Sequence, residues 1–191
     1  MLPTKLKAGG LEFNIEYKDF VDYGKRGRLY FEENRMTIKN GQCPQVQNES
    51  ITHETLHIAE IMAGLDLEEK YVQSAGLVLF GILRDNPNLF TQNRIKGAGF
   101  VYDVIFLDPV DPDGETESVL WIKHDSCQIR IKSGTGPVRA EQLLMYAVLD
   151  IIDLILDLDT VQDVKHRLGN WLYTLLKDNP QIWPHVVMGE G

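Results

Sequence analysis

The chain has 191 residues, of which 43% are hydrophobic and 25% charged, and its formal net charge is -9 at pH 7. This composition predicts a folded globular protein. Its scattered lysines and arginines exclude a nucleic-acid binder, which needs a clustered basic face. No stretch approaches membrane-spanning length, and residues 1–10 lack the apolar core of a signal peptide. We therefore expect a cytoplasmic protein without a membrane partner, with Cys43 and Cys127 as free thiols.

The chain contains one sequence pattern twice. Residues 6–13 (LKAGGLEF) return 89 positions later as residues 95–102 (IKGAGFVY), and residues 83–87 (LRDNP) return 93 positions later as LKDNP. The four extra residues fall in the segment 108–114, whose Pro, Gly and Asp content is typical of a turn or exposed loop. The pattern predicts a tandem duplication, with residues 1–92 as the first repeat and 93–191 as the second, packed together as one body.

Each repeat has the same predicted order of elements. In the first repeat, alternation of apolar and polar residues predicts strands at 11–17, 28–31 and 35–39. Helical spacing then predicts helices over 49–63, which ends at Gly64, and over 68–83. The second repeat has predicted strands at 100–107, 119–123 and 127–132 and helices at 141–156 and 161–176. The expected fold class is α+β, a tandem duplication of a small unit in which short antiparallel strands precede two helices.

A motif with metal chemistry lies in the first predicted helix. The sequence His53-Glu54-Thr55-Leu56-His57 places two histidines four residues apart, so both stand on one helix face and can bind one zinc ion. Glu54 lies beside them and can take a proton from a water molecule at the metal without being a ligand. We therefore predict His53 and His57 as metal ligands and Glu54 as the catalytic general base.

The third ligand has to approach from outside the motif helix. Glu68 and Glu69 open the next predicted helix, and at most one of them can point at the metal. Glu69 is the favoured ligand and Glu68 the alternative. Glu60, one turn beyond His57, is expected to orient a ligand or its neighbours, or to face solvent, rather than to bind zinc.

The second repeat serves as an internal comparison for these assignments. With the 93-residue spacing, the four candidate site residues correspond to Tyr146, Ala147, Asp150 and Gln162. Apolar residues at packing positions persist, as in Leu56 and Leu149. The second repeat is therefore expected to be a scaffold without metal.

The first repeat resembles a known family at these positions. The HETLH motif, the following LDLEE segment and the helix that runs to Asp-Asn-Pro are similar to the ImmA/IrrE family of phage and prophage zinc peptidases, over residues 6–88. The resemblance implies a minimal gluzincin-like fold, zinc held by His53, His57 and Glu69, and Glu54 as the base. In that family a glutamate three residues before a small or branched residue, here Val72, completes the site. Its best-known members cleave transcriptional repressors, but this chain has no helix-turn-helix region and carries a second copy.

The expected function is hydrolysis of a peptide bond in an intracellular protein, in the host cytoplasm if the chain is phage-encoded. The substrate would add as a strand to the sheet edge that we expect at Arg35–Lys39. The alternative is a non-enzymatic phage-type binding or regulatory protein that keeps the fold and at most a structural zinc. A weaker alternative is a helical interaction module without metal. Substitution of Glu54 distinguishes the peptidase from the non-enzymatic binding protein, because only hydrolysis needs the general base.

Overall fold

The structure is a computed structural model that describes residues 2–22, 24–97, 99–108, 110 and 119–183. The elements of the first repeat are β1 (Lys5–Ala8), β2 (Leu11–Lys18), β3 (Gly27–Tyr30), the 3-10 helix η1 (Phe31–Glu33), β4 (Arg35–Lys39), α1 (Pro44–Met62) and α2 (Glu69–Asp85). Those of the second repeat are β5 (Arg94–Gly97), β6 (Phe100–Leu107), β7 (Leu120–Lys123), β8 (Gln128–Lys132), α3 (Pro137–Leu156) and α4 (Gln162–Asp178). The shared order confirms the α+β class and the tandem duplication. Most of the expected loop at 108–114 lies outside the described residues.

Each repeat forms a four-stranded mixed sheet, with strand orders β1-β2-β4-β3 and β5-β6-β8-β7. The outer pairs are antiparallel, but the central pairs β2–β4 and β6–β8 run parallel, so the sheets are not purely antiparallel as expected. The expectation that Arg35–Lys39 is the sheet edge is wrong, because β4 lies between β2 and β3. Three consecutive residues of β4, Met36, Thr37 and Ile38, are buried, as in a strand covered on both faces. The edge strands of this sheet are β1 and β3.

The helices match the predicted ones except at two N-termini. Helix α1 starts at Pro44 and α3 at Pro137, each four or more residues before the predicted start. Proline is favoured in the first helical turn because its ring fixes a helical φ and its missing N–H is not needed there. Six residues, 63–68, separate the end of α1 at Met62 from the predicted third ligand Glu69, and Gly64 among them has a φ of 61°.

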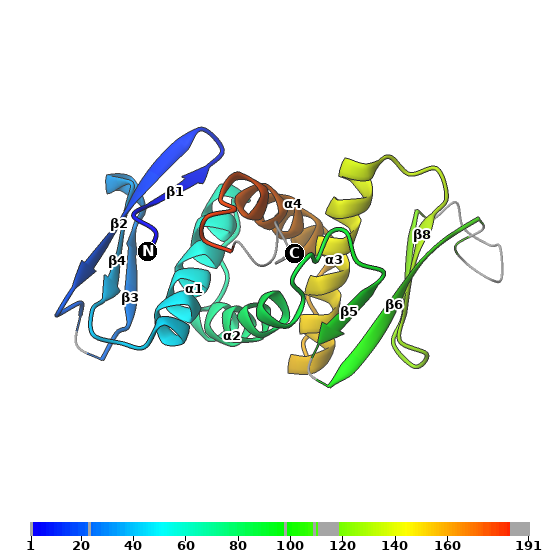
Figure 1. Cartoon of the computed structure of the whole chain (residues 1–191), viewed down its shortest axis with the longest axis horizontal. Helices are drawn as coiled ribbons and strands as arrows, with labels where there is room; N and C mark the ends of the chain where they lie inside the picture. The colour runs from blue at the N-terminus through cyan, green and yellow to red at the C-terminus, as the bar shows by residue number, and fades with distance from the viewer. Residues whose placement is uncertain (1, 23, 98, 109, 111–118, 184–191) are drawn as a thin grey trace.

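The two sheets lie at opposite ends of the molecule, and the four helices fill the space between them (Figure 1). Helix α1 packs against α2 and α4, and α3 packs against α2 and α4, so one continuous hydrophobic core includes residues of both repeats. Among the described residues, no helix has the length and apolar character needed to cross a bilayer.

Two buried asparagines join the repeats reciprocally. Asn86, after α2, accepts a hydrogen bond from the backbone N–H of Lys96 and donates one to its carbonyl, both at 2.7 Å. Asn179, after α4, makes the same two bonds at 2.7 Å to the backbone of Lys7. Because Lys7 and Lys96 correspond in the two repeats, each repeat ends on the first strand of the other. This exchange accounts for the asparagine of the repeated Asp-Asn-Pro sequence.

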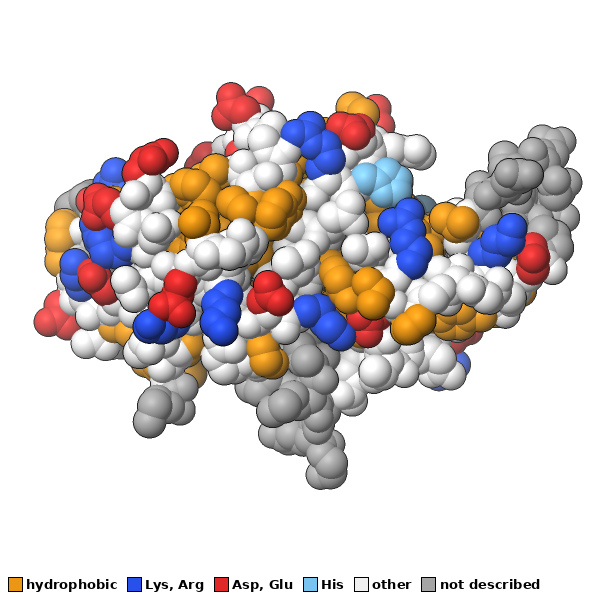
Figure 2. Space-filling model, turned by 90° about the horizontal axis from the view of Figure 1, so that it is seen from above, with side chains coloured by type: hydrophobic (Ala, Val, Ile, Leu, Met, Phe, Trp, Pro, Cys, Tyr) orange, Lys and Arg blue, Asp and Glu red, His pale blue; other side chains and the backbone are white. Residues whose placement is uncertain are grey.

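Charged side chains on the surface are mixed in sign. On the face seen in Figure 2, basic and acidic side chains alternate, with small groups of hydrophobic side chains between them. The described part of that face therefore presents no extended area of one charge.

Candidate metal centre

The candidate site lies where α1 and α2 approach each other in the first repeat. His53, Glu54 and His57 are in the middle of α1, and Glu69 is the first residue of α2. Gly76 on α2 allows the close approach, because a Cβ atom there would lie 3.3 Å from the His53 Cα. The corresponding Gly169 faces the backbone of Tyr146 at 3.5 Å, so both repeats use a glycine at this helix crossing.

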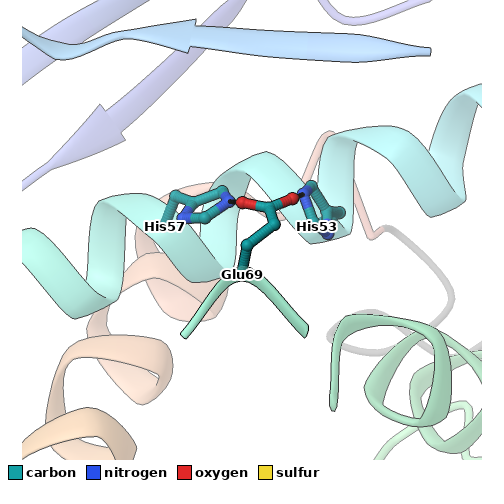
Figure 3. A group of neighbouring side chains, drawn as sticks. All are labelled: His53, His57 and Glu69. Atoms are coloured by element: carbon teal, nitrogen blue, oxygen red, sulfur yellow. Dashed lines mark ion pairs between the residues drawn. The ribbon is translucent and has the colours of Figure 1, made fainter. Parts of the chain in front are cut away.

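His53, His57 and Glu69 converge on one point (Figure 3). The Glu69 carboxylate reaches between the two imidazoles, with Oε1 3.5 Å from His53 Nε2 and Oε2 3.2 Å from His57 Nε2. In a tetrahedral zinc site with bonds of 2.0–2.1 Å, neighbouring ligand atoms are about 3.3 Å apart. The two distances are close to this value, although they involve different carboxylate oxygens, and one ligand atom of each residue lies within 4.8 Å of the other two, so the three side chains can hold one metal ion. Within the described residues this is the one group of histidine, cysteine and acidic side chains with such geometry.

The structure distinguishes between the two candidates for the third ligand. Glu69 is in the group, whereas Glu68 precedes the first turn of α2, is exposed and is not part of the group. The Glu69 side chain is itself 66% exposed, so the site opens to solvent on this side.

Glu60 orients His57. Its Oε2 lies 3.0 Å from His57 Nδ1, and its Oε1 accepts a 2.6 Å hydrogen bond from the backbone N–H of Leu67. With Nδ1 hydrogen-bonded to the carboxylate, Nε2 is the nitrogen that faces the ligand group, an arrangement typical of metal-bound histidines. Glu60 is 6% exposed, so the solvent-facing alternative was wrong, and the orienting role fits the geometry.

Burial favours the neutral form of His53, which is the form that binds metals. Desolvation, together with the nearby His57, lowers the pKa of His53 below its ordinary value. The two rings meet edge to face, with centroids 4.8 Å apart, and this places both Nε2 atoms toward Glu69.

Glu54 is buried beside the ligands and is not one of them. Its burial, and next the negative charge of Glu69, raise its pKa to about 7, while a backbone hydrogen bond from Leu29 and the charges of Lys25 and Arg28 act in the opposite direction. A carboxylate with a pKa near neutrality can both accept and return a proton.

Gly27 on the edge strand β3 makes room for Glu54. A Cβ atom at Gly27 would lie 2.7 Å from Glu54 Oε1 and 3.1 Å from its Cγ. Gly27 was not predicted as a site residue, although a comparison of the two repeats points to it. Where the first repeat has Gly27 and Glu54, the second has Leu120 and Ala147, so the large and small residues are exchanged.

An open cleft of about 590 Å³ contains the site. One wall is formed by β3 and the residues before it, from Gly24 to Leu29, and the opposite wall includes Gln73 and Leu77 of α2. The ligand group and Glu54 lie between the walls, so a chain segment placed along β3 would pass over them.

The second repeat has an ion-pair cluster where the first has its ligands. Asp150, which corresponds to His57, contacts His124 Nε2 at 2.9 Å and also pairs with Lys165. Lys165, which corresponds to Val72, lies 3.4 Å from Asp153, the counterpart of Glu60. The Lys165 ammonium thus places a positive charge between two carboxylates. The second repeat therefore has a lysine cation inside the unit in place of the candidate metal-binding residues.

No known protein family, curated protein or solved structure gives a significant match to this chain.

Proposed function

We propose that the protein is a zinc-dependent metallopeptidase of the HExxH type, similar to the ImmA/IrrE family in its first repeat. The observation that carries this proposal is the convergence of His53, His57 and Glu69, whose ligand atoms lie within 4.8 Å of one another, next to a buried Glu54 that is not in this group. Two nitrogens and one oxygen, with an open fourth position, are typical ligands of a catalytic zinc.

A bound zinc ion would polarise the scissile carbonyl and make an attacking water more acidic. Glu54 would accept a proton from that water as the water oxygen bonds to the carbonyl carbon. The same carboxyl group would then give the proton to the amide nitrogen as the C–N bond breaks, which its pKa of about 7 allows. Glu60 would hold His57 in position, and Gly27 would leave room for the Glu54 carboxylate.

The substrate would be an extended peptide that adds as a strand to β3. β3 takes this role in place of β4, because β3 is an edge strand and β4 is not. Among the described strands β3 pairs with β4 alone, so its other side has backbone groups without a strand partner, of which the Leu29 N–H bonds to Glu54. Because β3 lines the cleft beside Glu54, a peptide paired with it would lie over the ligand group.

The first test is the zinc content of the full chain purified without added metal, with His53→Ala, Glu69→Ala and Glu54→Gln variants. We expect about one zinc per chain, lost in the two ligand variants and retained in Glu54→Gln. Hydrolysis of a mixed peptide library should then fall by about 100-fold or more in Glu54→Gln. Zinc without hydrolysis in the parent would favour the non-enzymatic alternative, and a metal-free parent would reject the zinc site.

A further inference from the structure

We propose that the cleft selects peptides that carry an acidic side chain beside the basic side chains of the β3 wall and an apolar side chain toward α2. This inference rests on the proposed peptidase function and adds a substrate class to it. It follows from the unequal charge of the two cleft walls.

The β3 wall of the cleft is basic although the chain as a whole is acidic. Lys25, Arg26 and Arg28 all line the cleft and are exposed, in a chain with a net charge of -9. Arg26 has a long ion pair of 3.5 Å with Glu49, and Arg28 pairs with Asp22. Within the described part of the chain, Lys25 has no ion-pair partner, so its charge is available to a ligand.

The acidic residues of the cleft do not offset this charge. Glu49 pairs with Arg26, and the remaining two are Glu54 and Glu69 of the metal centre. A divalent ion at the metal centre would balance the charges of those two carboxylates. With the ion bound, the cleft would be net positive, which attracts an acidic peptide and repels a basic one.

The second repeat lacks these basic residues together with the metal ligands. With the same spacing, Lys25, Arg26 and Arg28 correspond to Ser118, Val119 and Trp121. Residues needed only for the packing of the unit would be expected in both repeats, as the helix-crossing glycines are. The basic residues instead occur only beside the metal centre, which indicates a role in what binds there.

The α2 wall offers an apolar surface. Leu77 lines the cleft with 55% of its surface exposed, and Ile61 on α1, which also lines the cleft, is 42% exposed. Leu77 corresponds to Asn170 in the second repeat, so this exposed leucine is also specific to the metal-bearing repeat. An exposed apolar side chain in a cleft favours an apolar group of the ligand.

An extended peptide can use both walls at once. Successive side chains of a strand point to opposite sides. Because those sides are the two faces of the sheet, a peptide paired with β3 would direct alternate residues toward the helices, where Leu77 lines the cleft. The residues between them would lie on the opposite face, which Arg26 and Arg28 share since Gly27 faces Glu54. The expected recognition unit is an acidic residue next to an apolar one.

The experiment compares internally quenched peptide pools that differ only at one fixed position, occupied by Glu, Gln or Lys. The enzyme is the zinc-loaded full chain and its Lys25→Ala, Arg28→Ala and double variants. Lys39→Ala is the matched control, since Lys39 is an exposed lysine on the adjacent β4 that does not line the cleft. In parallel, fluorescence anisotropy measures binding of a labelled Glu-containing and a labelled Lys-containing peptide to the same proteins.

We expect kcat/KM for the Glu pool to exceed that for the Lys pool by about five- to tenfold at low salt. The ratio should decrease toward one in the Lys25→Ala/Arg28→Ala double variant and at high ionic strength, and stay unchanged in Lys39→Ala. Cleavage of all pools at equal rates would overturn the inference and leave the peptidase proposal intact. Preferential binding of the Glu peptide without cleavage of any pool would support the inference and reject the peptidase. Absence of both binding and cleavage would reject both.

Discussion

Gly27 and Glu54 are so close that a methyl group on the glycine would lie 2.7 Å from the carboxylate Oε1. We predict that Gly27→Ala displaces the Glu54 carboxylate and lowers kcat/KM by about 100-fold, since a small misplacement of a catalytic group has effects of that size. Zinc content should stay at the parent value, because the ligands are untouched. The matched control is Gly81→Ala in α2, where an added methyl group meets no atom within 4 Å. Unchanged hydrolysis in Gly27→Ala would argue against Glu54 as the base.

Glu60 is predicted to set the affinity of the metal centre. Glu60→Gln removes the carboxylate that contacts His57 Nδ1, and loss of such a partner weakens metal binding by about 10- to 100-fold. Competition with a chromophoric chelator measures the zinc dissociation constant. Glu68→Gln, an exposed acid next to Glu69, should bind zinc like the parent. If instead the Glu68 variant loses zinc and the Glu60 variant does not, the ligand geometry described above is wrong.

Asn179 is predicted to contribute strongly to stability. Asn179→Ala leaves the N–H and carbonyl groups of Lys7 without their side-chain partner and should reduce the free energy of unfolding by about 2–3 kcal/mol. Urea denaturation of the full chain checks this value. Asn170→Ala, an exposed position on the same helix, is the control and should unfold like the parent. Asn86→Ala should cost a similar amount, because its two bonds to Lys96 are the same.

The Lys165 cluster is predicted to stabilise the second repeat through its positive charge. Lys165→Met would leave Asp150 and Asp153 without their cation and should reduce the free energy of unfolding by about 3 kcal/mol. Converting both aspartates to asparagine in the same variant should recover much of the loss. Lys70→Met, at an exposed position of α2, is the control.

The pH dependence of this effect follows from the lysine. Burial alone would lower the pKa of Lys165, but Asp150, Tyr146 and Asp153 together raise it above its ordinary value of 10.5. Since the folded state holds the proton more tightly, the contribution is fully present below pH 10.5 and is lost as the pH rises through the folded pKa. The stability difference between parent and Lys165→Met should therefore stay constant from neutral pH to about pH 10. A difference that falls within this range would contradict the proposed ion pairs.

Local patterns predicted the helices and placed the two histidines of the candidate site on one helix, because both depend on nearby positions. The spacing of His53 and His57 on one helix face is a property of the helix itself. The choice between Glu68 and Glu69 as the third ligand could not be made from the sequence. It depends on the rotation of α2 about its axis, which is set by the path of the loop from Gly64 into that helix. The hydrogen bond between Glu60 and Leu67 could not be predicted from the sequence either, since it depends on the path of the same loop.

Strand order was the weakest part of the sequence analysis. Sheet edges are decided by which strands pair, and β2 pairs with β4 although β3 lies between them in the sequence. The four-residue strand β1 was not predicted as a separate element, because it is short and forms a hairpin with β2 through Gly9 and Gly10, both at positive φ. The three buried residues of β4 were visible in the sequence only as Met-Thr-Ile, which does not distinguish a central strand from an edge.

The exchange of Asn86 and Asn179 has the form of a symmetric dimer contact made within one chain. The asparagine of each half hydrogen-bonds the backbone of the first strand of the other half. Two halves of this chain, produced as separate polypeptides, should therefore assemble with each other and depend on one another for folding. Covalent linkage also removes the symmetry that a dimer of identical subunits would impose. One half can then keep the candidate metal-binding residues, while the other has an internal salt bridge in their place without loss of the shared core.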